Sequence, residues 1–191
     1  LWADGLLIPP STAKPSRWAQ PDKFSMENNR IHSLDPICNN KSNILILGSM
    51  LGKTSWENKR YYDFGDNCFW EFIFSITKCK SATDYGIKTR TLIENKIAIW
   101  DVLKYCERDT SLDSDIKNEI PNDFNTFLKN HKNIQIICFN GTAARKFYKK
   151  YIGFTAEYKY YLLPSSSPTP GRNVKPKSEK LKCWLEIQKY I

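Results

Sequence analysis

A buried strand and a tight turn are encoded in one stretch, Asn43-Ile44-Leu45-Ile46-Leu47-Gly48-Ser49-Met50-Leu51-Gly52. The run from Ile44 to Leu47 is apolar throughout instead of alternating, which is typical of a strand covered on both faces of a parallel sheet. A glycine turn directly after such a strand lets backbone amides approach a ligand closely. The turn is not a P-loop, because the Gly-x-x-x-x-Gly-Lys-Ser/Thr spacing is absent.

Three further apolar runs and four helical segments follow this stretch. The runs are 97–100, 134–139 and 158–163, and the helical segments are 68–79, 123–130, 142–151 and 177–190, with Asn122 as the predicted N-cap of the second helix. Strands that alternate with helices predict an α/β protein, here a three-layer α/β/α sandwich around a mostly parallel four-stranded sheet. In such folds ligands bind at the carboxyl ends of the strands.

The first residues differ from the rest of the chain. Prolines interrupt residues 7–10 and 14–16, and no apolar periodicity is present before Ile31. We therefore expect residues 1–30 to form a flexible N-terminal extension and residues 31–191 to form one domain. A chain of 191 residues is long enough to bury a full core.

Positive charge is concentrated in the last part of the sequence. The chain has 29 Lys and Arg against 20 Asp and Glu, a formal net charge of +9. The segment 141–191 holds eleven basic and three acidic residues, so it accounts for +8 of that charge. A basic region in one part of a globular domain is typical of a protein that binds a polyanion, although a solvated lysine-rich surface is the alternative.

The cysteines and the hydropathy limit the class of protein. The six cysteines include no Cys-x-x-Cys pair, and the chain has only two histidines that could act as further ligands, so we expect no metal site. Cys138 lies in an apolar run and is predicted to be a small buried hydrophobic residue. No signal peptide and no apolar stretch of membrane-spanning length is visible. We expect a cytoplasmic protein with reduced thiols, no membrane contact and a monomeric state.

Three clusters of unusual residues fall at the predicted strand ends. After the first strand, Tyr61, Tyr62, Phe64 and Asn67 combine aromatic rings with an amide, which suits a flat heterocycle that is stacked on one face and hydrogen-bonded at its rim. Ordinary tyrosines at the edge of the core are the alternative explanation. Asn140 follows the third strand and can present a donor and an acceptor to a base edge, unless it caps the next helix.

The third cluster is a serine- and proline-rich loop after the fourth strand. Its hydroxyls and amides could contact phosphates beside two cations, in the residues Ser165, Ser166, Ser167, Pro168, Arg172 and Lys175. A plain surface loop would have the same composition. Each cluster has an ordinary explanation alone, but three at the same edge of one sheet indicate a binding site for a base and its DNA backbone.

These segments resemble the hypoxanthine-DNA glycosylase family of the uracil-DNA glycosylase superfamily. The similarity runs from about Ile31 to the C-terminus in the order of the family. It includes 45–52, Tyr61-Tyr62, Asn67-x-Phe69-Trp70, 100–103, Cys106-x-Arg108, 111–116, 122–124, 139–144 and 163–168. It implies a monofunctional DNA glycosylase that flips out a deaminated base, by default hypoxanthine, and hydrolyses its glycosidic bond. It implies no cofactor and DNA as the partner.

The resemblance also implies roles for single residues. Asn67 corresponds to the residue that positions the attacking water, Tyr62 stacks on the base, and Asn140 reads the base edge. The turn that contains Met50 contacts the base, while Lys53, Thr54 and Ser55 lie near phosphate. Phe64 is a predicted base contact from the aromatic cluster alone. The loop from Ser165 to Pro168 pinches the DNA backbone, with Arg172 and Lys175 beside it.

The chain departs from the family pattern between the tyrosines and the asparagine. It has Asp63-Phe64-Gly65-Asp66 where the family usually has x-His-Pro-Arg, and Leu51 where the family usually has proline. Asp63 or Asp66 could therefore activate the water, since carboxylates are competent bases. The same change raises an alternative substrate, a bulky phage-modified base such as glucosylated hydroxymethylcytosine, whose removal would serve antiviral defence. A non-catalytic DNA-binding module is the alternative from another class.

Overall fold

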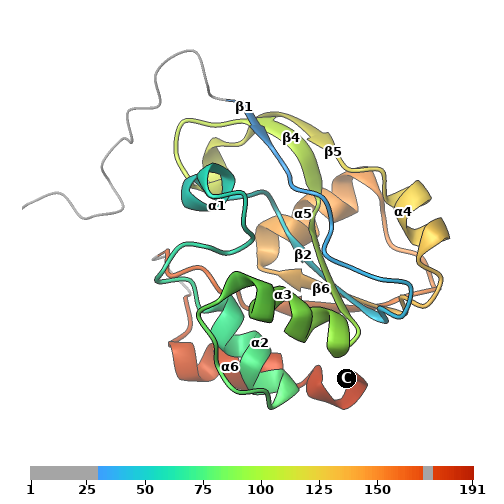
Figure 1. Cartoon of the computed structure of the whole chain (residues 1–191). Helices are drawn as coiled ribbons and strands as arrows, with labels where there is room; N and C mark the ends of the chain where they lie inside the picture. Colours follow the sequence, from blue (N-terminus) through green and yellow to red (C-terminus); the bar gives the residue numbers. More distant parts are fainter. Residues whose placement is uncertain (1–29, 170–173) are drawn as a thin grey trace, which may run out of the picture.

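A computed structural model describes residues 30–169 and 174–191 of the chain. Its centre is a four-stranded parallel sheet with the strand order β3-β2-β6-β7 (Figure 1). The strands are β2 (Ile44–Gly48), β3 (Ile97–Asp101), β6 (Ile136–Asn140) and β7 (Lys159–Leu163). Every residue of β2 and β3 is buried, as their continuous apolar runs predict.

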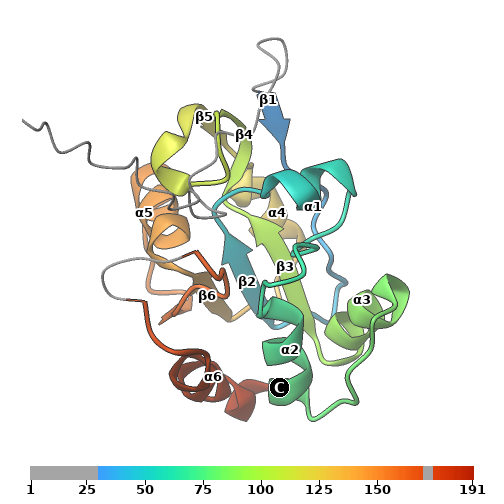
Figure 2. The same cartoon turned by 90° about the vertical axis from the view of Figure 1, so that its left-hand side faces the viewer.

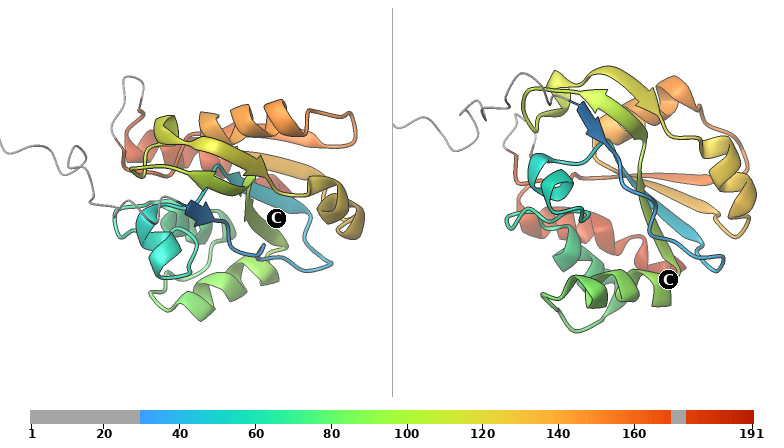
Figure 3. Two further views of the ribbon diagram at one scale, coloured as in Figure 1. Left: turned by 90° about the horizontal axis from the view of Figure 1, so that it is seen from above. Right: turned by 45° about the horizontal axis from the view of Figure 1, so that its top comes forward.

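Helices cover both faces of this sheet. One face is covered by α5 (Thr142–Tyr151) with α4 (Phe124–Asn130) beside it, and the opposite face by α2 (Phe69–Thr77), α3 (Tyr85–Glu94) and α6 (Lys177–Leu185), as Figures 2 and 3 show. The short helix α1 (Lys53–Glu57) follows the glycine turn. The protein is therefore an α/β/α sandwich, as the alternation of strands and helices predicts.

A second sheet was not predicted from the sequence. It is antiparallel, with the order β1-β4-β5, and consists of β1 (Arg30–His32), β4 (Leu103–Glu107) and β5 (Lys117–Pro121). A 3₁₀ turn, η1 (Asp113–Asp115), lies in the connection from β4 to β5. β5 is mostly exposed and β4 is only partly buried, so neither strand carries a continuous apolar run. The connection between β4 and β5 extends towards the carboxyl ends of the parallel strands.

Most predicted elements are found within a few residues of their expected bounds, with four differences. Asp123 rather than Asn122 caps α4, because its carboxylate accepts from Thr126 N, while the buried Asn122 amide donates to the backbone oxygen of Asp101 at 2.8 Å. The last helix ends at Leu185, and a separate 3₁₀ turn, η2 (Gln188–Tyr190), follows it. β7 is an edge strand and is half exposed. Helices α1 and α3 were not predicted.

The expected domain boundary near Ile31 stays a prediction. The described chain begins at Arg30, and Ile31 is already in the core. The predicted extension over residues 1–30 lies outside the described residues except for Arg30. Cys138 is fully buried in β6, as expected for a small hydrophobic residue. Among the described residues, no helix is both long and apolar enough to cross a membrane.

Candidate active site

A cleft of about 580 Å³ opens at the carboxyl ends of the parallel strands. Each strand delivers residues to it: Gly48 ends β2, Asp101 ends β3, Asn140 ends β6, and Ser165 follows β7. The neighbouring segments that line it are 49–55, Tyr61, Tyr62, Phe64, Asn67, Arg108 and 110–113, and the serine loop continues to Thr169. The three clusters that the sequence placed at strand ends therefore line one cleft.

The aromatic wall of the cleft is built on Tyr62. Its backbone has a φ of 55°, in the left-handed region that few non-glycine residues adopt. This conformation places the Tyr62 ring flat on Phe69, the first residue of α2, with 3.7 Å between ring centroids and 11° between ring planes. One face of Tyr62 is therefore covered by the protein, and a planar ligand in the cleft can stack only on the other.

The Tyr62 hydroxyl and the Asp101 carboxyl converge on Gly48. A Cβ atom built on Gly48 would lie 2.5 Å from Asp101 Oδ1 and 3.0 Å from the Tyr62 hydroxyl oxygen. The first contact is too close for a real side chain and the second is tighter than most, so the absence of a side chain at position 48 is what allows the two groups to approach. The Tyr62 hydroxyl is buried and makes no hydrogen bond of ordinary geometry among the described residues, although the Asn140 side chain is close enough to lower its pKa. Burial and the Asp101 charge both raise the pKa of Tyr62, so it stays protonated.

Asp101 is a buried carboxyl in the floor of the cleft, with 3% of its surface exposed. Ser33 Oγ donates to its Oδ2 at a long 3.4 Å. Burial raises the pKa of Asp101 to about 7, although the nearby Arg108 charge acts in the opposite direction. At neutral pH both forms of this carboxyl are therefore populated.

Arg108 borders the same cleft and is 2% exposed. Its Nε and Nη2 atoms are buried and have no hydrogen-bond partner among the described residues. Asp101, Asp113 and Asp115 contribute electrostatically to this guanidinium, while burial lowers its pKa. A guanidinium stays protonated in proteins, so an unpaired positive charge lies at this wall.

Asn140 and Ser166 also line the cleft and are hydrogen-bonded to each other. The Asn140 Nδ2 donates to Ser166 Oγ at 2.9 Å, and the Ser166 backbone N donates to Asn140 Oδ1 at 2.8 Å. Gly141 follows with a φ of 100°, and a Cβ there would lie 3.1 Å from the Ser165 Cβ. Asn140 thus fixes the serine loop with its amide, and it retains one N–H and one carbonyl lone pair for a ligand.

Helices α2 and α6 anchor the serine loop from behind. The Lys180 Nζ donates to the Ser167 backbone oxygen at 2.9 Å, and the Trp184 Nε1 donates to the Pro164 oxygen at 2.9 Å. The backbone N of Cys68 donates to the Ser166 oxygen at 3.0 Å. Lys180 is 6% exposed, and burial lowers its pKa. The loop is therefore held at three positions, Pro164, Ser166 and Ser167, by groups outside it.

Asn67 lies at the start of α2, on the cleft side. Its Oδ1 accepts from the Phe69 backbone N at 3.0 Å, and its own backbone N donates to the Phe64 oxygen at 2.8 Å. The carbonyl of the side chain is therefore used to cap the helix, and this fixes the direction of the amide group. An amide oriented in this way can donate to a water molecule, but it cannot accept a proton as a base.

The structure brings most other predicted site residues to the cleft. Met50, Phe64, Lys53, Thr54, Ser55 and Pro168 all line it, together with the three serines. Ser55 and Ser166 are buried, and the Ser55 Oγ accepts from the Asp63 backbone N at 3.1 Å. These two hydroxyls therefore face neighbouring protein groups in the free protein.

Three predicted residues lie elsewhere. Asp63 accepts from Asn58 Nδ2 at 2.7 Å, Asp66 is exposed, and neither is among the described residues that line the cleft. Lys175 is exposed just before α6, also outside the lining, and its Nζ lies 3.8 Å from Cys183 Sγ. Arg172 falls outside the described residues.

Sequence reasoning missed three polar residues of this site, namely Asp101, Arg108 and Lys180. Asp101 ends an apolar run directly after Trp100, so its position at a strand end was a usable signal. Arg108 follows a strand that has no clear pattern, and Lys180 lies among exposed lysines. Within residues 30–169 and 174–191, no three His, Cys, Asp or Glu side chains are grouped as metal ligands would be.

Comparison with known proteins gives consistent matches. The family model for the Uracil DNA glycosylase superfamily matches residues 36–188. A protein named hypoxanthine DNA glycosylase from Methanosarcina acetivorans is 35% identical over 132 residues, which is 69% of this chain and 82% of the relative. A protein of the same name from Methanosarcina barkeri is 31% identical over 155 residues, 81% of this chain and 95% of the relative.

A solved structure shares the fold. It is the solution NMR structure of a Methanosarcina acetivorans protein described as a candidate uracil DNA glycosylase. The match has a TM-score of 0.72 and 29% sequence identity, and it covers 84% of this chain and 98% of the other.

Proposed function

The chain belongs to the uracil DNA glycosylase superfamily, and we propose from this premise that its substrate is hypoxanthine in DNA. The protein is a DNA N-glycosylase, a hydrolase of N-glycosyl bonds that takes DNA as its substrate. The choice of base rests on the two relatives named for hypoxanthine. The structural observation that carries it is a single cleft with Tyr62 on one wall and amide groups at its rim.

The base enters this cleft by rotating out of the helix. It stacks on the free face of Tyr62, while the backbone of the turn that contains Met50 and the ring of Phe64 line its sides. The N–H of Asn140 that Ser166 does not use contacts the base edge. Since extrusion costs a few kcal/mol of stacking and pairing, a deaminated base that pairs poorly is extruded most easily.

Asn67 orients the attacking water in this proposal. Hydrolysis of the N-glycosidic bond builds positive charge on the sugar and negative charge on the departing base. An amide cannot take the proton of the water, so Asn67 acts by holding the water at C1′. Asp63 and Asp66 stay possible water activators only if DNA binding brings them to the cleft, since they do not line it in the free protein.

The rim of the cleft grips the DNA backbone. The backbone amides and hydroxyls of Ser165 and Ser167 are held in place by α2 and α6, and Lys53 and Thr54 lie on the other side of the opening. Lys175 adds a cation just beyond the loop, and Arg172 completes the proposed set. Such contacts position the strand without reading its sequence.

The test is base release from a duplex that carries one deoxyinosine. Purified protein should release hypoxanthine and leave an abasic site, so that strand breaks appear only after treatment with alkali. Breaks before alkali would show a bifunctional enzyme and contradict the monofunctional proposal. The absence of breaks after alkali, with abasic sites produced from deoxyuridine instead, would remove hypoxanthine as the substrate. The Asn67→Ala protein serves as the control for contaminating glycosylases.

The two alternatives raised by the sequence have unequal standing. The non-catalytic module is set aside, because the protein is a glycosylase. The phage-modified base was suggested by Asp63 and Asp66, which lie outside the cleft lining, so we do not extend the proposal to it. We propose that the protein acts as a monomer on cytoplasmic DNA.

A further inference from the structure

Asp101 and Arg108 are two charged groups that share one cleft without pairing. Each is more than nine-tenths buried, and both line the cavity that receives the base in the proposed function. Within the described chain, the guanidinium Nε and Nη2 have no partner, and the carboxyl has only the long contact from Ser33. Buried opposite charges in one cavity normally form a hydrogen-bonded pair, because leaving either of them unpaired is costly.

We propose that Asp101 and Arg108 read the deaminated edge of the extruded base, as specificity-determining residues for 6-oxo and related oxo bases. Deamination replaces an exocyclic amino donor by a carbonyl acceptor, and it replaces the adjacent ring acceptor by an N–H donor. An adjacent acceptor and donor are what a guanidinium and a carboxylate need. In hypoxanthine, Arg108 binds O6 and Asp101 accepts from N1–H.

The unpartnered atoms of Arg108 fit this role in their geometry. The Nε–H and one Nη2–H of a guanidinium point to the same side and form a two-pronged donor. These two nitrogens are the ones without partners. A carbonyl oxygen accepts from both prongs, whereas the amino group of adenine offers only donors to them. The arrangement therefore favours the deaminated base and rejects its parent.

Several other polar groups of the cleft have partners within the protein. The Asn140 amide is joined twice to Ser166, and the Asn67 carbonyl caps α2. Ser49 Oγ donates to Asp113 Oδ1 at 2.6 Å, so this second acid of the cleft has a partner. Asp101, with a pKa of about 7, supplies an ionised acceptor in a large fraction of molecules at neutral pH. The guanidinium is thus a buried charged group of the cavity with two nitrogens left for a ligand, and the carboxyl beside it accepts only the long hydrogen bond from Ser33.

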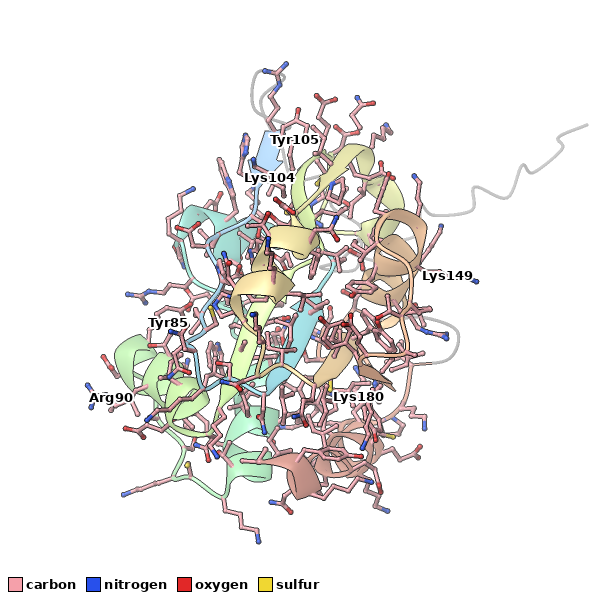
Figure 4. All side chains as sticks on the ribbon, turned by 90° about the vertical axis from the view of Figure 1, so that its right-hand side faces the viewer. Tyr85, Arg90, Lys104, Tyr105, Lys149 and Lys180 are labelled. Atoms are coloured by element: carbon pink, nitrogen blue, oxygen red, sulfur yellow. The ribbon has the colours of Figure 1, made fainter. Side chains whose placement is uncertain are left out.

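The role is measurable as binding, separately from turnover. Duplexes carry either 2′-fluoro-2′-deoxyinosine or 2′-fluoro-2′-deoxyadenosine opposite thymine, because the fluorine slows glycosidic cleavage. The measured quantity is the ratio of the affinities for the two duplexes. This ratio is compared between two proteins, so that the cost of opening each duplex, which is the same for both proteins, cancels. Arg108→Met should lower the preference for inosine roughly 5- to 150-fold, the range of one good bidentate contact to a base. The matched control is Arg90→Met, since Arg90 is an exposed residue on α3, outside the cleft lining (Figure 4).

A melting curve separates this role from a structural one. Methionine fills a similar volume without a buried unpaired charge, so Arg108→Met should melt at the same temperature as the wild type or above it. An unchanged preference for inosine in a folded Arg108→Met protein would overturn the proposal. If that variant does not fold, the wild type decides with single-stranded probes, in which no base pair has to be opened. Equal affinity for 1-methylinosine and inosine in single strands would also overturn the proposal, because the methyl group removes the N–H from which Asp101 accepts.

This inference rests on the proposed function, but the two fail differently. If the wild type releases no hypoxanthine from an ordinary deoxyinosine duplex, the proposed substrate is wrong. If it releases hypoxanthine and Arg108→Met keeps the preference for inosine, only the roles of Asp101 and Arg108 are wrong.

Discussion

Asn140 and Ser166 are joined by reciprocal hydrogen bonds of 2.9 and 2.8 Å, which connect the end of β6 to the loop after β7. One bond uses the Ser166 hydroxyl and the other its backbone N–H. An asparagine that the sequence indicated as a base contact or a helix cap therefore shapes the loop that is proposed to bind the DNA backbone. Mutations at the two positions separate these roles.

Asn140→Ala should lower both stability and turnover. It breaks both bonds and leaves the buried Ser166 groups without partners, at a cost of about 1–3 kcal/mol in the free energy of unfolding. Ser166→Ala keeps the bond from the backbone and should therefore have the smaller effect on both quantities. Urea unfolding and single-turnover assays on deoxyinosine duplexes measure them. An Asn140→Ala protein as stable as the wild type would show that the bonds contribute nothing.

Asn67 has a structural role and a proposed catalytic role, which two substitutions distinguish. Asn67→Ala removes the cap of α2 and should cost about 0.5–2 kcal/mol of stability as well as turnover, with DNA binding spared. Asn67→Asp keeps an oxygen for the Phe69 N–H and should keep stability, while the amide donor is lost. Thermal melting, binding and single-turnover rates are compared. Wild-type turnover in Asn67→Ala would refute the assignment of the water to this residue.

Lys180 is expected to act on the DNA through the serine loop. Lys180→Met removes the donor to the Ser167 oxygen and should weaken DNA binding, while stability changes little because a buried ammonium group is also removed. Lys182 is exposed on the same helix, so Lys182→Met is the matched loss of charge. Binding isotherms at fixed salt are the measurement. Equal weakening in the two variants would mean that only the charge matters.

Lys175 should contribute a phosphate contact. Lys175→Ala should weaken binding to all sequences and reduce the slope of log affinity against log salt by about one. Lys149→Ala is the control, since Lys149 projects from α5 outside the cleft lining (Figure 4). An unchanged slope for Lys175→Ala would place this lysine away from the DNA.

Asp101 should make the protein less stable as the pH rises from about 4 to 7. Its pKa is about 7 in the folded protein, against an ordinary value of 3.8, because it is buried. The folded state therefore holds a proton that the unfolded chain has lost in this range, and the free energy of unfolding falls as the pH rises. Arg108 and Asp113 act on the same group in opposite directions.

The measurement is urea unfolding of the wild type and of Asp101→Asn across that range. The free energy of unfolding of the wild type, minus that of the variant, should fall from pH 4 to pH 7 and then level off. Parallel curves would show that Asp101 titrates normally. The comparison with the variant removes the contributions of Glu107 and Asp123, whose pKa values are lowered by their hydrogen bonds.

The parallel sheet could be predicted from the sequence because burial on both faces leaves a continuous apolar run, as in Ile44–Gly48 and Ile97–Asp101. The antiparallel strands Leu103–Glu107 and Lys117–Pro121 could not, since they are short and partly exposed. Arg108 was missed for the same reason. Its position relative to Asp101 depends on this antiparallel sheet, which the hydrophobic pattern of the sequence does not indicate.

The side chains at the strand ends were predictable as a group, but their partners were not. Asn67 and Asn140 both line the cleft, and the sequence alone indicated each as a base contact or a helix cap. In the structure Asn67 caps α2, whereas Gly141 takes the N-cap position of α5 and Asn140 binds Ser166. Such hydrogen bonds depend on loops that are distant in sequence, so residue type and spacing cannot determine them.

The contact between Tyr62 and Phe69 has a consequence for what happens when a nucleotide leaves its neighbours. The two rings already lie parallel, 3.7 Å apart, before any nucleic acid arrives. A purine laid on the open side would become the third layer of a pile whose lower layers belong to the protein. Stacking on this preformed surface would replace stacking on the two neighbouring bases, and the protein would not have to rearrange. Part of the free energy needed to extrude the base from the duplex would therefore be recovered in the cleft.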